Sequence, residues 1–406
     1  MWHVEVGRID RRKRFDHILL QIGGCRYGRA ELSPHRFGDA AGAVLPSRMA
    51  RIIAVAPALP DHVYAQADIT AMIGPLVTQD RTRQAILERL HASSKVDTRH
   101  LVMPLERYAD PQTFTQSNDL FIEVALDLAE RSLAAALDSA GLDASDIDYI
   151  IFTSVTGISA PSIDALLISR MGLRDDVKRV PIYGLGCVAG AAGIARVDDY
   201  LAGHPDAIAA LVAVELCSLT FQRDDSSMAN LVATGLFGDG AASVVMAGER
   251  RAIALGAHAS GLDIISTRSR VYPETEAVIG FNAGETGFRI VLTPEVTSVI
   301  ETYFAADVDA FLAPLGLTVS DIDHFVAHAG GPKILEAFAS SLGLSDTAFE
   351  ISWRSLAEVG NLSSVSVLHT LSRSISEHAH HAGELTLLFA LGPGVSVELV
   401  LLRAAS

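Results

Sequence analysis

Apolar residues in this chain gather in short runs that predict buried strands, separated by longer stretches with the spacing of amphipathic helices. The strand-like runs include residues 51–56, 149–153, 180–183 and 324–328. Strands that alternate with helices are typical of layered α/β folds. Before residue 49 the pattern is missing, because mixed charges and scattered glycines show no sustained periodicity. We therefore expect residues 1–48 to form an extension without assigned chemistry, and Met49 is a plausible natural start of the chain.

An internal repeat relates two halves of the chain. Residues 137–153 predict a helix end, a glycine, the tripeptide Asp-Ile-Asp and a buried strand, and residues 313–328 predict the same series. Gly316 lies 175 positions after Gly141, and the two Asp-Ile-Asp tripeptides have the same offset. A repeated supersecondary unit of this kind predicts duplicated α/β halves, which we place at 49–250 and 251–406.

Cys187 lies in the run Tyr-Gly-Leu-Gly-Cys-Val-Ala-Gly at 183–190, which predicts a glycine turn between a strand and a helix that reaches about Leu201. Backbone amides and the helix dipole at such an N-terminus stabilise a thiolate. The sequence therefore predicts a nucleophile whose pKa lies below the ordinary thiol value of about 8.5. The alternative is a buried cysteine that serves as a small hydrophobic side chain.

The repeat also predicts which residues accompany Cys187. The offset of 175 leads from Cys187 to position 362, beside Asn361 in a second glycine turn at 359–364 that opens a helix. His328 ends the strand of the second repeat. A pseudo-twofold axis between the halves would bring these three side chains into one cavity, whereas a strand-end histidine is by default only a satisfied polar residue.

Cysteine, histidine and asparagine together suit acyl transfer through a thioester. His328 and Asn361 would form an oxyanion hole for an enolate or a tetrahedral intermediate. We therefore expect a decarboxylative Claisen condensation, in which a malonyl thioester loses CO₂ and the enolate attacks an acyl group on Cys187, with no metal involved. A papain-type hydrolase uses the same residue types, but its asparagine orients the histidine on a different fold. We expect Glu215 and Asp239 to be structural partners of backbone groups or helix ends.

Composition narrows the possible partners and location. The net charge of −16 argues against a nucleic-acid-binding surface. The three cysteines show no paired or metal-ligand spacing, which favours a reducing compartment and no zinc site. No apolar run approaches the roughly 18 residues that span a bilayer. We therefore expect a cytoplasmic protein without a membrane span.

These segments resemble the thiolase superfamily, and more closely the chalcone-synthase-like type III polyketide synthases, from about Arg51 to the C-terminus. The resemblance implies a duplicated, five-layered αβαβα fold, a homodimer, and acyl-CoA and malonyl-CoA as substrates with no further cofactor. It places gatekeeper residues at Phe237, in the run 236–241, and at Phe288, in the run 287–290. Gly392, Pro393 and Gly394 match the family's cavity loop, although Ala390-Leu391 replaces its first two residues.

The resemblance also implies residues for the coenzyme A carrier. Arg89 falls at a family position that meets the phosphates, and Gly330 and Gly331 follow His328 in the run assigned to this carrier. Another family position holds lysine where this chain has Ser93, which leaves Lys95 as a nearby substitute. The alternative is a solvated helix face.

Three stretches, 155–161, 184–192 and 275–280, are similar to actinobacterial alkylpyrone and alkylresorcinol synthases, which use long-chain acyl-CoA starters. Ala160 falls where chalcone synthases carry a methionine that reaches the partner's cavity, and Thr156, Cys217 and Thr220 are implied to line the same region. The expected function is loading of a fatty acyl-CoA on Cys187, extension with malonyl-CoA or methylmalonyl-CoA, and cyclisation to an alkylpyrone or alkylresorcinol.

Two rival interpretations remain open from the sequence. A ketoacyl synthase III would condense once with an acyl carrier protein, but residues 328–331 read His-Ala-Gly-Gly rather than the His-Gln-Ala-Asn typical of that group. A non-catalytic binding protein of the same fold would not need all three candidate catalytic residues. Starter length, extender, number of condensations and cyclisation mode depend on cavity shape, which the sequence does not determine.

Overall fold

A computed structural model of the chain describes residues 49–223, 225–256, 261–378 and 380–405. The extension expected at residues 1–48 lies outside these ranges, as does Cys25.

Nine of the described strands form one long sheet whose two parts correspond to the two halves of the chain, and β2 with β3 and β9 with β10 form two separate two-stranded sheets. The first part runs in the order β5-β4-β6-β7-β1 and the second in the order β11-β12-β13-β8. The parts join where β1 pairs with β8 at Ile52 and Leu262. The bounds of these strands are β1 Arg51–Ala58, β4 Ile147–Thr153, β5 Lys178–Ile182, β6 Ile208–Leu216, β7 Asp239–Ala247, β8 Leu262–Val271, β11 His324–Ala327, β12 Leu385–Gly392 and β13 Ser396–Ala404.

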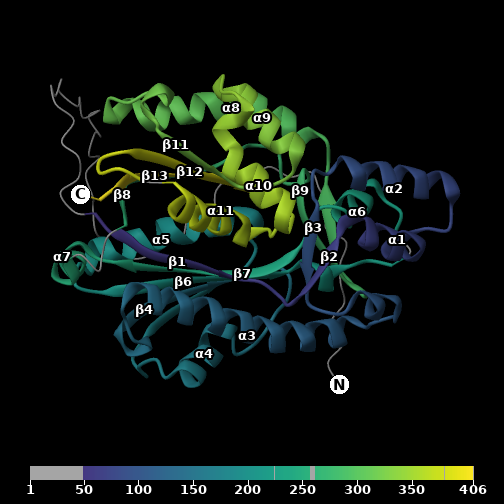
Figure 1. The fold of residues 1–406 in the computed structure, drawn as a ribbon, viewed down its shortest axis with the longest axis horizontal. Coiled ribbons are helices and arrows are strands. Elements are labelled where there is room, and N and C mark those ends of the chain that lie inside the picture. Colours follow the sequence, from purple (N-terminus) through teal and green to yellow (C-terminus); the bar gives the residue numbers. More distant parts are fainter. Residues whose placement is uncertain (1–48, 224, 257–260, 379, 406) are drawn as a thin grey trace, which may run out of the picture. The chain divides into compact units, whose positions relative to one another are not determined.

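Helices cover both faces of each part of the sheet, so the molecule is built of five layers (Figure 1). Helices α3 (Phe114–Ala140) and α4 (Ile163–Met171) cover the outer face of the first part, and α8 (Glu295–Leu312) and α9 (Pro332–Leu342) cover that of the second. Helices α5 (Ala189–Gly203) and α11 (Ser364–Glu377) lie between the two parts. Strands β6 and β7 are buried throughout because both of their faces are covered, which explains their nearly continuous apolar sequence. The duplicated αβαβα fold is therefore confirmed.

The repeat predicted from the sequence recurs in three dimensions. Gly141 ends α3 with φ 64°, and Gly316 ends the helical region after α8 with φ 71°. Both values lie in the left-handed region that glycine adopts at low cost. A 3₁₀ turn follows each glycine, and then β4 runs parallel to β6 just as β11 runs parallel to β12.

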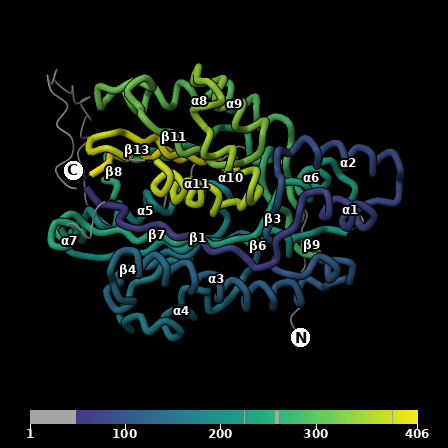
Figure 2. The backbone as a smooth tube through the Cα atoms, viewed as in Figure 1, coloured from purple at the N-terminus to yellow at the C-terminus, as the bar shows by residue number. Residues whose placement is uncertain are grey.

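Most of the remaining elements gather at one end of the layers and surround the candidate site (Figure 1). Figure 2 shows that α2, early in the chain, lies beside α6, more than a hundred residues later. Helix α7 (Glu249–Leu255) lies at the opposite end and α10 (Glu350–Val359) precedes α11. The elements at the site end are β2 His62–Ala65, α1 Gln66–Val77, α2 Arg81–Ser93, β3 Thr98–Leu101, α6 Met228–Ala233, β9 Ile279–Gly284 and β10 Gly287–Leu292.

Candidate active site

Cys187 lies in a tight turn between β5 and α5, as the sequence predicts. The turn is a short 3₁₀ segment, Gly186–Val188, that leads directly into the helix. Gly186 has φ 56°, and a Cβ at this position would lie 2.7 Å from Cδ of Pro393. Only glycine satisfies both conditions. The C-terminal loop therefore packs directly on the turn that carries the thiol.

Asn361 occupies the turn between α10 and α11, close to the position that the offset of 175 predicts. Its Oδ1 accepts hydrogen bonds from the backbone N–H of Ser363 at 2.8 Å and from Oγ of Ser366 at 3.2 Å. The thiol of Cys187 donates to Oγ of Ser363 at 3.4 Å. Ser363 has φ 51°, an uncommon value for a residue with a side chain. The two helix starts thus meet at the Cys187–Ser363 contact.

His328 follows β11 and is 3% exposed. Its backbone N–H donates to the carbonyl of Phe389 at 2.9 Å, and its ring packs on Gly330. The side-chain N–H of Asn361 donates to the carbonyl of that same Gly330 at 3.1 Å. Within the described residues, Nδ1 of His328 is buried without a hydrogen-bond partner. The structure therefore places His328 and Asn361 beside one another at Gly330.

The low pKa predicted for Cys187 is wrong for the protein without substrate. Burial raises the pKa of this thiol to about 12, the hydrogen bond to Ser363 opposes the rise, and the Glu215 carboxylate adds to it. Burial also lowers the pKa of His328 to about 4. Thiol and imidazole are therefore both neutral at pH 7, because desolvation outweighs the helix dipole. A neutral imidazole is the form that can accept a proton from the thiol.

Glu215, at the end of β6, is fully buried behind the Cys187–Ser363 contact. Its carboxylate accepts hydrogen bonds from Oγ of Ser364 at 2.6 Å, Oγ1 of Thr156 at 3.0 Å and the backbone N–H of Val155 at 3.1 Å. Burial raises the pKa of Glu215 to about 7, and these donors limit the rise. The carboxylate connects the first half of the fold to the start of α11, which agrees with the structural role expected from the sequence.

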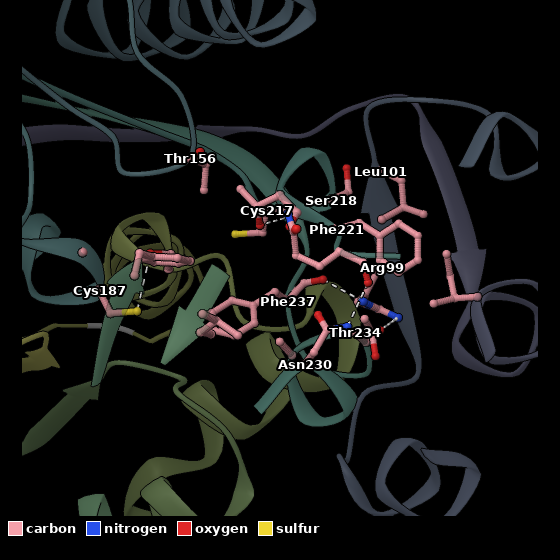
Figure 3. Close-up of a pocket in the computed structure, with 18 of the residues that line it drawn as sticks. Arg99, Leu101, Thr156, Cys187, Cys217, Ser218, Phe221, Asn230, Thr234 and Phe237 are labelled. Atoms are coloured by element: carbon pink, nitrogen blue, oxygen red, sulfur yellow. Dashed lines mark hydrogen bonds between the residues drawn. The ribbon is translucent and has the colours of Figure 1, made fainter. Parts of the chain in front are cut away.

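A cavity of about 940 Å³, including its opening to solvent, extends from Cys187. Figure 3 shows Cys187 at one side, Arg99 and Leu101 at the other, and Phe237 and Cys217 between them. The cavity brings together six of the residues that the sequence predicted for the site, which are Cys187, Thr156, Cys217, Thr220, Phe237 and Pro393.

Other predicted residues lie near the cavity but are not part of its wall. Phe288 is buried in β10 and packs edge-on against Phe114, with ring centroids 5.3 Å apart. Ala160 is exposed on the loop before α4. A Cβ at Gly392 would lie 2.7 Å from the backbone nitrogen of Val188, so the backbone of Gly392 packs directly against the turn that carries Cys187. Gly394 continues the loop with φ 73°.

The predicted coenzyme A residues form two separate groups. Arg89 is exposed on α2, and Lys95 is exposed just after this helix. Gly330 and Gly331 follow His328 and lie beside the chain segment that carries Phe237. A Cβ at Gly331 would be 3.3 Å from the side chain of Leu236 in this segment. None of the four lines the cavity. Within the described ranges, no group of three or more His, Cys, Asp or Glu could hold a metal ion.

Several residues of the cavity wall were not predicted from the sequence. Ser363 lies inside the predicted turn at 359–364, so the repeat offset could have indicated it. Arg99, Tyr108, Gln222 and Asn230 carry no local signal, because they reach the cavity through the packing of β3, α6 and the connecting segments. The wall residues that were not predicted include Ile69, Ile73, Arg99, Leu101, Tyr108, Ser218, Phe221, Gln222, Asn230, Thr234, Ile279, Phe281, Ile290 and Ser363.

Comparison with known proteins gives a consistent result. The family model described as "Chalcone and stilbene synthases, N-terminal domain" matches residues 39–250, and the corresponding C-terminal model matches residues 263–406. A protein of Streptomyces peucetius named 1,3,6,8-tetrahydroxynaphthalene synthase is 49% identical over 87% of this chain and 92% of its own length. The solved structure of 1,3,6,8-tetrahydroxynaphthalene synthase from Streptomyces coelicolor A3(2), described as a bacterial type III polyketide synthase, has a TM-score of 0.82 and 32% identity and covers 88% of this chain and 99% of its own.

Proposed function

The chain belongs to the chalcone and stilbene synthase family and is a type III polyketide synthase, and we propose that it builds a poly-β-keto chain on Cys187 from malonyl-CoA and cyclises it. The observation that carries the proposal is the meeting of the two helix starts, where Ser363 receives the thiol hydrogen bond and Asn361 lies two residues away. The family excludes the two rival interpretations, a ketoacyl synthase III and a binding protein without catalysis.

The proposed steps use the three predicted catalytic residues. The sulfur of Cys187 attacks the thioester carbon of the starter, His328 accepts the thiol proton, and coenzyme A leaves as its thiol after receiving a proton. Malonyl-CoA then loses CO₂, and the enolate oxygen is held by His328 and Asn361. The enolate carbon attacks the acyl thioester, which transfers the extended chain to coenzyme A and frees Cys187 for the next cycle. These steps require no cofactor beyond the coenzyme A thioesters.

We propose a small polyhydroxylated aromatic product made from malonyl-CoA alone. The relative that is 49% identical is named 1,3,6,8-tetrahydroxynaphthalene synthase, and ten ring carbons correspond to five two-carbon units. Hydroxyl and amide side chains of Thr156, Ser218, Thr220, Gln222 and Asn230 line the cavity, and they can bind the carbonyl groups of such a chain. Mass spectrometry after incubation with malonyl-CoA as the only substrate tests this, and absence of an aromatic product would refute it.

A second candidate is the fatty acyl-CoA starter with an alkylpyrone or alkylresorcinol product, as expected from the sequence. The apolar side chains of Leu101 and Phe221 line the cavity on the side away from Cys187. Ile69 and Ile73 also line the cavity, and these apolar side chains favour an alkyl tail. Competition between malonyl-CoA and a series of acyl-CoA starters, with either malonyl-CoA or methylmalonyl-CoA as extender, separates the two candidates by product mass.

We also propose that the enzyme is a homodimer formed through the edge of the sheet at β5. Among the strands that the structure describes, β5 lies at one end of the order, so one of its backbone edges has no partner within the described ranges. Apolar side chains are exposed around it, with Tyr183 at 57%, Ile158 at 48% and Val180 at 41%. A second copy pairing here would cover these side chains and place the Ala160 loop against its partner. Light scattering on the wild type and on Val180→Asp tests this, since the substitution should yield monomers.

Two further expectations stand as proposals. Arg89 and Lys95 are exposed at the end of the molecule where α2 lies, so their charges are available to coenzyme A phosphates. The cytoplasmic location is inferred from composition and stays a prediction. No helix in the described ranges is long and apolar enough to cross a membrane.

A further inference from the structure

Within the described residues, the buried guanidinium of Arg99 donates its hydrogen bonds to neutral groups, namely two backbone carbonyls and one side-chain amide. Arg99 lies on β3 and is 3% exposed. It donates to the carbonyl of Phe237 at 2.7 Å, to the carbonyl of Thr234 at 2.8 Å and to Oε1 of Gln66 at 3.0 Å. A buried charge without a directly bound carboxylate is costly unless its hydrogen bonds compensate. Burial lowers the pKa of Arg99 to about 10, and the Asp239 carboxylate opposes this change. Besides compensating the charge, the three hydrogen bonds fix the groups that they join.

All three contacts hold one turn, residues 234–237, which links α6 to β7. Two of its carbonyls bind Arg99 directly. A third is held through Gln66, whose Nε2 donates to the carbonyl of Gly235 at 2.7 Å. Since guanidinium donors form a rigid planar fork, they fix the direction of the carbonyls they bind. The turn that presents Phe237 to the cavity is thus fastened from the side of β3.

The opposite side of the same turn pairs with the backbone of Asn361. The N–H of Asn361 donates to the carbonyl of Leu236 at 2.8 Å, and the N–H of Gly238 donates to the carbonyl of Asn361 at 3.0 Å. The side chain of Arg99 also lies close to Gly360, the residue before Asn361, because a Cβ added there would be 3.2 Å from its Cδ. Arg99 therefore contacts both chain segments of this pair.

We propose that Arg99 is a positioning residue that sets the places of Phe237 and Asn361 relative to Cys187. Without its donors, the 234–237 turn is free to move away from β3 and carries the Asn361 backbone with it. The steps that depend on Asn361 then suffer, whereas loading of Cys187 does not. This inference rests on the proposed function through the role given to Asn361.

The test uses Arg99→Ala with added guanidinium chloride at concentrations far below those that unfold proteins. Arg99 is part of the cavity wall, so a free guanidinium ion can enter the space left by the side chain. Arg251→Ala is the matched control, since Arg251 binds Asp146 and lies on α7 at the opposite end of the molecule. Gln66→Leu removes only the third contact and is the milder variant if Arg99→Ala does not fold.

We expect Arg99→Ala to keep stoichiometric acyl loading of Cys187 by intact mass, and to lose about tenfold or more in kcat for malonyl-CoA decarboxylation. Guanidinium should restore several-fold activity in this variant and none in the control. Gln66→Leu should lose about threefold in the same step. Equal losses in loading and decarboxylation, or no response to guanidinium, would overturn the positioning role.

A second measurement does not depend on activity. Hydrogen exchange of the amides in residues 234–238 and 360–361 should accelerate together in Arg99→Ala and slow again with guanidinium. Acceleration spread evenly over the chain, or none, would overturn the inference. A wild type that does not decarboxylate malonyl-CoA would refute the proposed function, while the exchange pattern would still decide the role of Arg99.

Discussion

Replacement of Glu215 by glutamine should make the protein more stable at alkaline pH and leave its stability at pH 5 nearly unchanged. Glutamine keeps the size of the side chain and imitates the protonated carboxyl group. Its oxygen can accept both the N–H of Val155 and the hydroxyl of Thr156, which bind the same carboxylate oxygen of Glu215, while its NH₂ group can donate to the rotatable hydroxyl of Ser364. The substitution therefore removes the charge without removing the hydrogen-bond network.

The magnitude follows from the raised pKa of Glu215. Its pKa is about 7 in the folded protein and ordinarily 4.5, a difference that corresponds to about 3 kcal/mol. Because the folded state holds the proton more tightly, this stability is fully present below pH 4.5 and is lost as the pH rises through 7. The glutamine variant escapes the loss, since its side chain does not titrate.

Thermal unfolding of both proteins between pH 5 and pH 8.5 measures the effect. At about 1–2 °C per kcal/mol for a chain of this size, the Tm of Glu215→Gln should exceed that of the wild type by about 3–6 °C at pH 8.5. Glu123→Gln, at an exposed position on α3, is the matched control and should show no such trend. A difference in Tm between wild type and Glu215→Gln that stays constant across this pH range would refute the reasoning.

Three further predictions concern the site. Cys187→Ala should abolish product but retain some malonyl-CoA decarboxylation. Asn361→Ala should lose about tenfold or more in the rate of decarboxylation while Cys187 still accepts an acyl group. Full product formation by Cys187→Ala would refute the assignment of Cys187 as the nucleophile. Alkylation of Cys187 by iodoacetamide should accelerate through the alkaline range, because burial raises its pKa to about 12; a plateau that begins below pH 7 would contradict this. Ala160 is exposed in its own subunit, so Ala160→Met should change the preference between short and long acyl-CoA starters only if a dimer brings this loop to the partner's cavity. Product masses from a mixture of short and long starters measure this preference.

The duplicated fold and the meeting of the Cys187 and Asn361 turns could be predicted from the sequence because they depend on local patterns that occur twice, whereas the catalytic roles of Cys187, His328 and Asn361 stay predictions. Gly141 and Gly316 end equivalent helical segments in the same left-handed conformation. The same offset leads from Cys187 to the turn of Asn361, and α5 meets α11 so closely that a Cβ at Gly190 would lie 2.2 Å from the carbonyl of Ser364. Periodicity and glycine conformation are properties of short segments, so they can be seen without the tertiary structure.

The wall of the cavity and the charge states within it were decided by packing between distant segments. Arg99 reaches the Phe237 turn only because β3 packs beside β7 and α10, next to residues 234–237, and nothing in the sequence around Arg99 indicates that contact. Phe288 is buried in β10 and is not part of the wall, although the resemblance placed it as a gatekeeper of the cavity. Ala160 is exposed, and its expected place at the partner's cavity stays a prediction. The sequence predicts a helix N-terminus that favours the Cys187 thiolate, but the pKa depends on how much water the surrounding elements exclude. Desolvation is a property of the whole assembly around the thiol, so only the tertiary structure could set it.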